Sequence, residues 1–317
     1  MSRIVFMGTP EFAVESLRAL VDGGYNVVGV VTTPDKPAGK HQSDLKESPV
    51  KQYAIMKNLP LLQPVRLKDP AFLKHLQSWK ADLQIVVAFR MLPESVWDMP
   101  ELGTFNLHAS LLPQYRGAAP VNWAIINGEK ETGVTTFLID HEIDTGKIIS
   151  SEKITIAETD NAGTVHDKLM AIGAQLVLKT VDAIVSGTAQ RIEQKHAMSQ
   201  EIVLKPAPKI FKETCKIDWG KTVGEIHNFV RGLAPYPAAW TDLKTINNDI
   251  ISLKVFEVAK IAIPNGLPAG TVVSDGKNYL DVAVSDGFIR LNDIQQAGKK
   301  RMKIEEFLRG NGKNFQK

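Results

Sequence analysis

Short apolar runs alternate with helix-like periodicity along residues 1–188. Apolar runs of this length are typical of strands buried on both faces of a sheet. They lie at 3–8, 25–32, 82–89 and 133–140, and a fifth run at 104–110 begins in the same way. Between them, segments such as 69–79 and 161–186 repeat apolar residues at the spacing of amphipathic helices. The alternation predicts an α/β domain with a Rossmann-like parallel sheet.

The pattern changes after residue 188. Residues 189–208 are polar and include Pro206 and Pro208, which is typical of a linker. Residues 209–317 contain one helical segment, 223–233, and then short alternating runs separated by turn dipeptides. This spacing predicts a small OB-like β-barrel. We therefore expect an α/β domain over 1–188, a linker over 189–208 and a barrel over 209–317.

Length and charge fit two domains and indicate a class of partner. A chain of 317 residues exceeds one ordinary core, and 44% hydrophobic with 23% charged residues is typical of globular proteins. The net charge is only +3, yet residues 205–317 hold 18 Lys and Arg against 12 Asp and Glu. Such asymmetry favours a polyanionic partner for the second half. A solvated basic surface is the alternative reading.

The chain carries no predicted export or membrane signal. Its one cysteine, Cys215, cannot form an internal disulfide, which fits a reducing compartment. The first apolar run is too short for a signal peptide, and no run of 18 apolar residues predicts a membrane span. We expect a cytoplasmic monomer.

The run at 104–110 ends in polar residues. Asn106 and His108 lie two positions apart, so an extended chain points both to one face. In open α/β sheets, ligands bind just beyond the carboxyl ends of strands. A His acts as general acid or base near pH 7, and an Asn N–H can stabilise an oxyanion. The structural alternative is that His108 satisfies a backbone group and Asn106 caps a turn.

An acid cluster follows the next predicted strand. It comprises Asp140, Glu142 and Asp144. If strands 104–110 and 133–140 are neighbours, one of these acids can meet His108 and orient its ring. Asn, His and Asp without a Ser or Cys nucleophile favour transfer to an external nucleophile over a covalent intermediate. Their spacing matches no zinc template, so no metal is expected.

A longer pattern around these residues resembles the folate-dependent formyltransferases. Residues 106–120 read NLHASLLPQYRGAAP, and DTG follows at 144–146. Further matching strings are MGTPEFAV at the start, TPDKPAG, SPVK, IDW and PYPAAW, so the resemblance runs nearly end to end. Within the family it is strongest to members that act on methionyl-tRNA, which have this length and a C-terminal barrel.

The resemblance implies a reaction and its residues. The donor is 10-formyltetrahydrofolate, a co-substrate, and the acceptor is the free α-amino group of initiator methionyl-tRNA. The implied catalytic residues are Asn106, His108 and Asp144. Asn106 stabilises the oxyanion, with help from His108, while Asp144 orients His108 and assists proton movement from the amine to N10 of the folate. Residues 1–188 then form the catalytic domain, and 209–317 bind tRNA.

The resemblance also implies contacts with the folate. The residues concerned are Ser110, Leu111, Leu112 and Pro113, together with Phe89, Arg90 and Leu92 after the strand at 82–89. Core packing is the alternative for the leucines. The sequence departs from the family pattern at Arg90-Met91, where Gly-x-x-Leu-Pro is expected. At the start of the chain, Gly8-Thr9-Pro10 lacks G-x-G-x-x-G, so no NAD is expected.

Two basic regions are implied to contact tRNA phosphates. They are Lys36, Lys40 and Lys46 in the polar loop 33–51, and Lys299, Lys300 and Arg301 near the C-terminus. Lysines attract phosphates without regard to base sequence. A mobile polar loop is the alternative for 33–51.

Three other functions compete with this interpretation. A formyltransferase for a small amine, such as glycinamide ribonucleotide or an amino sugar nucleotide, would share the catalytic residues but would not need the basic regions. A non-catalytic RNA-binding module would not need Asn106, His108 and Asp144. A nicotinamide dehydrogenase would need the missing glycines.

Overall fold

Two compact units make up the chain. The structure is a computed structural model that describes residues 1–38, 44–196 and 203–315. Unit 1 contains Met1–Gly117, Thr132–Ile154 and His166–Pro206; unit 2 contains Ala118–Glu131, Thr155–Val165 and Ala207–Lys317. Unit 2 therefore takes two segments from the first half of the chain in addition to the predicted barrel region.

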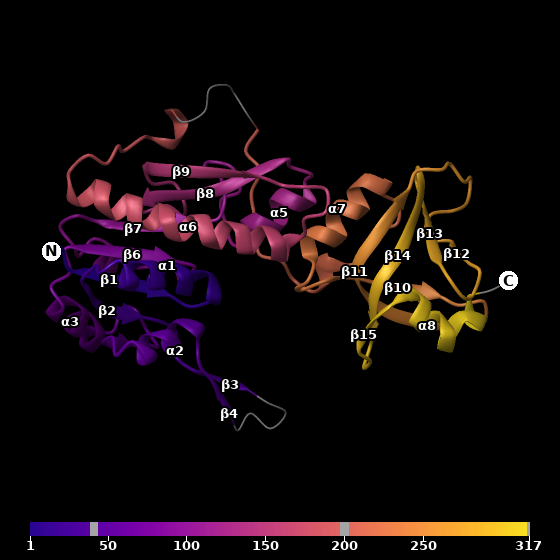
Figure 1. The fold of residues 1–317 in the computed structure, drawn as a ribbon, viewed down its shortest axis with the longest axis horizontal. Coiled ribbons are helices and arrows are strands. Elements are labelled where there is room, and N and C mark those ends of the chain that lie inside the picture. The colour runs from indigo at the N-terminus through magenta and orange to yellow at the C-terminus, as the bar shows by residue number, and fades with distance from the viewer. Residues whose placement is uncertain (39–43, 197–202, 316–317) are drawn as a thin grey trace. The chain divides into compact units, whose positions relative to one another are not determined.

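Unit 1 is built on a seven-stranded sheet (Figure 1). In spatial order its strands are β5 (Leu61–Leu62), β2 (Val27–Val31), β1 (Ile4–Gly8), β6 (Leu83–Val87), β7 (Thr104–His108), β8 (Glu131–Leu138) and β9 (Ile148–Thr155). Neighbours from β5 to β7 are parallel. β1, β2 and β6 are the predicted apolar runs, and their side chains are buried or nearly so. The predicted Rossmann-like sheet is confirmed for this part.

The sheet departs from parallel pairing at β8, which runs antiparallel to β7. A parallel return would need a helix that crosses over the sheet. The helix between the two strands, α5 (Pro120–Ile126), belongs to unit 2 and packs there against α7 (Val223–Leu233). β8 therefore begins beside the carboxyl end of β7 and runs back toward its amino end.

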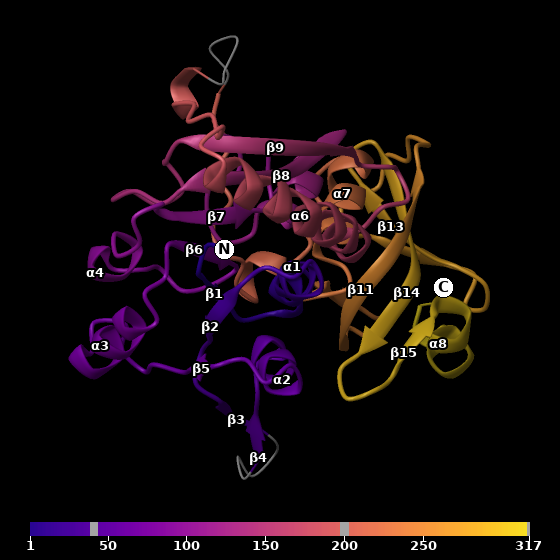
Figure 2. The same cartoon turned by 60° about the vertical axis from the view of Figure 1, so that its left-hand side comes forward.

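Helices cover both faces of the sheet. They are α1 (Glu11–Asp22), α2 (Pro49–Met56), α3 (Pro70–Ser78), α4 (Glu94–Trp97) and α6 (Ala162–Val185). Figure 2 shows α1, α2 and α6 on one side and α3 and α4 on the other. The Asp69 carboxylate caps α3 by accepting from the Ala71 N–H at 2.8 Å. Alternate side chains of β1 serve the two faces, and Val5 and Met7 pack toward α3 and α4.

The polar stretch predicted as a loop at 33–51 contains an antiparallel hairpin. It pairs β3 (Lys36–Ala38) with β4 (Asp44–Lys46). Its base is held by Lys51, whose ammonium pairs with Asp35 and, at 2.9 Å, with Glu47. Residues this polar carry no strand periodicity, so the hairpin was not predicted.

Unit 2 contains a curled antiparallel sheet. In order along the sheet its strands are β10 (Ala239–Lys244), β11 (Ile250–Ile261), β14 (Gly287–Gln296), β13 (Leu280–Val284) and β12 (Val272–Ser274), and β15 (Arg301–Lys303) also pairs with β14. The sheet and α7 enclose one apolar core, which includes Val230, Val255 and Ile289. The predicted OB-like barrel is thus confirmed in the form of a half-barrel.

One helix of unit 2 was missed. α8 (Ile304–Asn311) buries Ile304, Phe307 and Leu308, which are spaced at three and four positions. The prediction of a single helical segment after residue 209 is therefore wrong. The apolar spacing at 304–311 is a short helical pattern, and it follows the basic residues 299–301, which the resemblance implies to contact tRNA. No helix in the described part of the chain is long and apolar enough to cross a membrane.

Candidate active site

β7 presents the two predicted polar residues at its carboxyl end. Asn106 and His108 stand two positions apart on this strand, opposite Phe137 and Thr135 of β8. His108 is buried, at 7% exposure, and Asn106 is half-buried. Within the described residues, the Asn106 side-chain amide has no hydrogen-bond partner in the protein.

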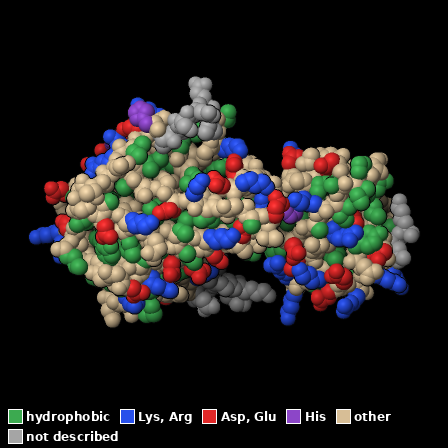
Figure 3. All heavy atoms as spheres, turned by 45° about the horizontal axis from the view of Figure 1, so that its top comes forward, with side chains coloured by type: hydrophobic (Ala, Val, Ile, Leu, Met, Phe, Trp, Pro, Cys, Tyr) green, Lys and Arg blue, Asp and Glu red, His purple; other side chains and the backbone are tan. Residues whose placement is uncertain are grey.

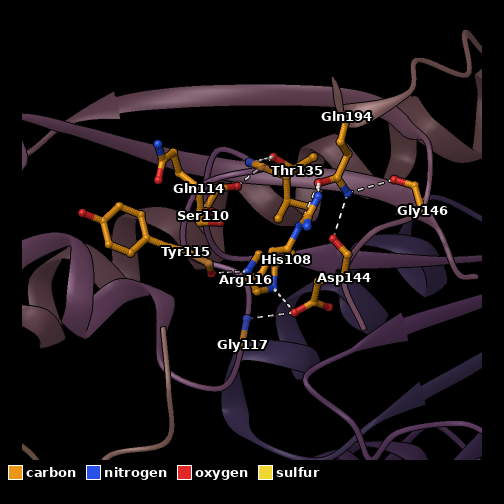
Figure 4. Close-up of polar contacts among 11 residues, drawn as sticks. His108, Ser110, Gln114, Tyr115, Arg116, Gly117, Thr135, Asp144, Gly146 and Gln194 are labelled. Atoms are coloured by element: carbon orange, nitrogen blue, oxygen red, sulfur yellow. Dashed lines mark hydrogen bonds and ion pairs between the residues drawn. The ribbon is translucent and has the colours of Figure 1, made fainter. Parts of the chain in front are cut away.

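The His108 ring is approached on both nitrogens (Figure 4). Nε2 lies 2.9 Å from the Tyr115 carbonyl oxygen, which can only accept, so Nε2 carries a proton. Nδ1 lies 3.9 Å from Oδ2 of Asp144, beyond hydrogen-bond length. The alternative that His108 satisfies a backbone group therefore holds for Nε2, while Nδ1 faces Asp144.

Asp144 reaches His108 by an unexpected route. Because β8 is antiparallel, its carboxyl end at Leu138 lies opposite Phe105, at the start of β7. The chain then returns over 139–147, where the Leu138 N–H donates to the Lys147 oxygen at 3.0 Å. Asp144 sits in this return with φ 57°, a conformation that Asp tolerates better than most residues. The predicted meeting of acid and histidine is confirmed, but strand adjacency does not produce it.

Two glycines allow this return to approach closely. A Cβ on Gly146 would lie 1.7 Å from the Leu138 oxygen, so only glycine fits there. The Gly117 N–H donates to Oδ2 of Asp144 at 3.0 Å. Asp144 is thus fixed by the loop after β7 as well as by its own loop.

The segment predicted to contact folate is shaped by a threonine that the sequence analysis missed. Thr135 Oγ1 donates to the Ser110 oxygen at 2.7 Å and accepts from the Leu112 N–H at 3.2 Å. Ser110 is buried and its hydroxyl donates to the Gln114 oxygen at 2.6 Å. A Thr inside a buried strand that also holds Thr132 and Thr136 gives no sequence signal for this role.

The leucines of this segment also pack within the fold. Leu112 joins Phe137 and Ile148 in a small apolar cluster. Leu111 lies over Gly133, where an added Cβ would come within 2.5 Å of its Cδ2. Pro113 is buried. Core packing, the alternative for the leucines, therefore accounts for much of both side chains, and contact with folate stays a prediction.

The loop after β6 is tethered through Arg90. Its guanidinium donates to the carbonyls of Pro64 at 2.7 Å and Val65 at 3.0 Å, and it lies over the Phe89 ring. Burial lowers the pKa of Arg90 from its usual value. Leu92 is buried in the core beneath α3 and α4. The structure thus assigns Arg90 partners inside the protein.

A second residue that the sequence analysis missed is Gln194. It lies in η1 (Gln194–His196), within the segment predicted as a linker, and is buried at 3% exposure. Its amide bonds to Arg116 and to the backbone of Asp144 and Gly146. The Arg116 guanidinium donates to Gln194 Oε1.

The predicted tRNA-contacting residues differ in their surroundings. Lys36 and Lys46 are exposed cross-strand partners in the β3–β4 hairpin, and Lys40 lies outside the described residues. Lys299 and Lys300 are exposed. They have no ion pair in the part of the chain that the structure describes.

Arg301 already has partners in unit 2. Its guanidinium makes two bonds to the Asp293 carboxylate, at 2.8 and 3.1 Å, and lies over the Phe256 ring. Burial alone would raise the pKa of Asp293, but the bonds from Arg301 and the nearby Lys303 outweigh it, and the pKa is lowered. Asp293 therefore stays ionised and holds Arg301.

No metal-binding cluster stands out. Among the residues described, no group of three or more His, Cys, Asp or Glu side chains is placed to hold an ion. The site instead brings together an amide, an imidazole and a carboxylate. Such groups can transfer a proton and stabilise an oxyanion, as the transfer of an acyl-type group requires.

Comparison with known proteins gives the class first. The formyl transferase family matches residues 2–181, and the C-terminal domain of formyl transferases matches residues 209–312. The chain belongs to the formyl transferase family.

Individual relatives narrow the class. The chain is 64% identical to the methionyl-tRNA formyltransferase of Azobacteroides pseudotrichonymphae, over 98% of this chain and 96% of the relative. It is 62% identical to the methionyl-tRNA formyltransferase of Bacteroides thetaiotaomicron, over 97% and 95%. The similarity covers both units and the segment between the two family matches.

Solved structures share the fold. The N-formyltransferase from Helicobacter canadensis, in complex with folinic acid and dTDP-3-aminofucose, has a TM-score of 0.67 at 22% identity, covering 93% of this chain and 100% of that one. HypX from Aquifex aeolicus, in complex with tetrahydrofolic acid, has a TM-score of 0.62 at 17% identity, covering 98% and 47%. At these identities the likeness supports the architecture alone.

Proposed function

We propose that this protein transfers a formyl group from 10-formyltetrahydrofolate to the α-amino group of methionine on initiator methionyl-tRNA, for translation initiation. The observation that carries the proposal is His108, which faces Asp144 at 3.9 Å two positions along β7 from Asn106, in a chain of which nearly the full length is 64% identical to a methionyl-tRNA formyltransferase. Structural neighbours crystallised with folinic acid or tetrahydrofolic acid support a folate co-substrate.

The proposed chemistry forms one bond and breaks one. The neutral α-amine attacks the formyl carbon, forming a C–N bond and placing negative charge on the formyl oxygen. The bond from that carbon to N10 of the folate then breaks, tetrahydrofolate leaves, and the proton lost by the amine ends on N10. An α-amine has a pKa of roughly 7.7–8.0 in peptides, so a neutral fraction exists at pH 7.

Each residue has a role that its surroundings support. The Asn106 amide, free of protein partners among the described residues, donates to the oxyanion. Because Nε2 of His108 already donates to Tyr115, Nδ1 is the atom that can take up or release a proton. Asp144, fixed by Gly117, faces that atom at 3.9 Å and orients the ring.

Transfer to a small amine is the less favoured function. Eight relatives at 49–64% identity over 97–98% of the chain are methionyl-tRNA formyltransferases. The exposed lysines of the β3–β4 hairpin and of the turn before β15 supply charge that a tRNA acceptor would use and a small amine would not.

The deciding experiment is a transfer assay. Formyl transfer from 10-formyltetrahydrofolate is measured with charged initiator tRNA, with elongator methionyl-tRNA and with free methionine. We expect turnover on the initiator tRNA and far less on the other two. Equal activity on all three would remove the tRNA-specific function, and no activity on any would remove the proposal altogether.

A further inference from the structure

The Gln194 side chain uses its whole hydrogen-bonding capacity on two site loops (Figure 4). Its Oε1 accepts from Nη2 and Nε of Arg116, at 2.6 and 3.1 Å. Its Nε2 donates to the carbonyl oxygens of Asp144 at 2.8 Å and of Gly146 at 2.9 Å. A primary amide has two donor hydrogens and two acceptor lone pairs, so all four are satisfied.

The two loops that Gln194 joins are the ones that hold His108. Arg116 follows Tyr115, whose carbonyl accepts from Nε2, and precedes Gly117, whose N–H donates to Asp144. Asp144 lies in the return from β8 and faces Nδ1 at 3.9 Å. Gln194 therefore bonds to Arg116, the neighbour of Tyr115, and to the backbone of Asp144 itself, and among the described contacts it makes none with the His108 ring.

The backbone around Gln194 is anchored independently of its side chain. Ile192 pairs with Ile148 of β9 through two backbone bonds, of 2.8 and 2.9 Å. Past the undescribed residues, the Lys205 oxygen accepts from the Tyr115 N–H at 2.8 Å. Removing the Gln194 amide should therefore loosen the site loops without detaching this segment from unit 1.

We propose that Gln194 is a positioning residue: through its bonds to Arg116, Asp144 and Gly146 it sets the place of Asp144 against Nδ1 of His108. This inference rests on the proposed function, because it assigns a role within that reaction. Asp144 sits in a left-handed conformation on a loop that leaves the sheet, so a hydrogen-bonded clamp on its carbonyl controls where its carboxylate points.

The test compares Gln194→Met with Gln194→Glu. Met matches the length of Gln without its hydrogen bonds, whereas Glu keeps the acceptors for Arg116 and loses the donors to Asp144 and Gly146. A displacement of about 1 Å at a reacting group can cost about 10²-fold in rate, so we expect Gln194→Met to lower kcat by tenfold to about a hundredfold. KM for either substrate should change by less than about threefold, because the Gln194 amide makes all its hydrogen bonds with protein groups. Gln194→Glu should resemble Met, not the wild type.

Thr180→Val is the matched control. Thr180 is buried on α6, and its hydroxyl bonds to Thr136 at 2.8 Å and Leu176 at 2.7 Å, away from the loops that hold His108. This variant also loses buried hydrogen bonds of unit 1, so it should lower the melting temperature while kcat stays near the wild-type value. If Gln194→Met does not fold, the comparison rests on Gln194→Glu.

A double-mutant cycle separates positioning from general stability. If Gln194 acts through Asp144, Gln194→Met should cost little further rate in an Asp144→Asn background. Full additivity, or a kcat for Gln194→Met equal to that of Thr180→Val, would overturn the inference. So would a crystal structure of Gln194→Met with the Asp144–His108 separation unchanged. If the wild-type protein transfers no formyl group, the proposed function itself is overturned, and the role of Gln194 within it falls as well.

Discussion

For the single residue His108, the hydrogen bond at Nε2 determines which ring nitrogen is left to react. The Tyr115 carbonyl fixes the proton on Nε2 and leaves Nδ1 toward Asp144. A histidine held this way has one reactive atom and one orientation. Asn106, half-buried on the same strand face, has a free amide among the described residues. An imidazole fixed in position next to an available donor is the feature that the proposed transfer needs.

Replacing Asn106 should separate its catalytic role from its structural one. Asn106→Ala is expected to lower kcat by about 10²–10³, the typical cost of losing one oxyanion donor. Because the amide bonds to no described protein group, the melting temperature should hardly change. Asn106→Asp keeps the shape but replaces the donor by a negative oxygen, so it should be at least as slow. Steady-state rates and thermal unfolding check both, and near-normal turnover of Asn106→Asp would contradict the role.

The resemblance implies that Arg90 contacts folate, whereas the structure gives its guanidinium partners inside the protein, and a substitution can separate the two roles. Lys cannot reproduce the forked bonds to the Pro64 and Val65 carbonyls, so Arg90→Lys should lower the free energy of unfolding by about 1 kcal/mol. KM for 10-formyltetrahydrofolate should stay near the wild-type value. Denaturant titration and kinetics measure the two effects. An unchanged stability with a raised KM would instead place the folate against the guanidinium.

At the scale of elements, the reversed strand β8 decides the site. Its direction sends residue 139 away from His108, and only the tight return at Gly146 brings Asp144 back. The segment at 189–208, predicted as a linker, supplies Gln194 to the same return. Sequence proximity to a strand end is therefore a poor guide to which acid meets which histidine.

Element contacts in unit 2 give a pH-dependent prediction. Glu158 pairs with Lys130 at 2.8 Å and with Lys260 of β11 at 3.0 Å, and hydrogen bonds from Lys130 and Lys260 lower its pKa to about 2. A carboxylate with a lowered pKa stabilises the fold fully above its unfolded value of 4.5, and the effect is lost as the pH falls toward 2. The pair is exposed, so its contribution at pH 7 should be below about 1 kcal/mol.

The measurement is denaturant unfolding of Glu158→Gln and the wild type at pH 7, 5 and 3.5. The difference in free energy of unfolding should persist at pH 5, shrink by pH 3.5 and weaken with added salt. Glu305→Gln on α8, where the described chain offers no ion pair, is the control and should show no such trend. A difference that is independent of pH would argue against the ion pairs.

Across the molecule, ion pairs with Asp and Glu determine which Lys and Arg side chains are available for phosphate contact. Residues 205–317 carry 18 Lys and Arg against 12 Asp and Glu, yet Arg290 and Arg301 each form a two-pronged bond with an aspartate. Figure 3 shows Lys and Arg interspersed with Asp and Glu on the face in view. Lys299 and Lys300 are exposed, and the described chain gives neither an ion pair, so they remain the better candidates for phosphate contact.

Salt dependence tests this division. Each lost phosphate contact should reduce the slope of log binding constant against log salt by about 0.7–0.9, so Lys299→Ala with Lys300→Ala should flatten it by up to about twice that. The control pair, Lys277→Ala with Lys313→Ala, removes the same charge from exposed positions elsewhere in unit 2 and should leave the slope unchanged. Equal slopes for both pairs would refute the assignment. Arg301→Ala should mainly lower stability, because the buried Asp293 carboxylate loses its two-pronged bond and keeps only Lys303, at 3.4 Å.

The buried strands, the main helices, the two-part organisation and the face shared by Asn106 and His108 can all be predicted from the sequence. These follow from apolar periodicity and strand alternation, which are properties of short stretches of chain. The resemblance carried by the motif at 106–120 pointed to the formyltransferase family before any fold was known.

The direction of β8, the return that carries Asp144, and the partners of Arg90 and Arg301 follow from the folded chain and not from local sequence. Gln194 bonds to residues 50 and 78 positions away, and nothing in its own neighbourhood marks it. Such contacts depend on the path of the whole chain, which fixes which loops meet. The local pattern supplied the reactive groups, and the path of the chain fixed their geometry.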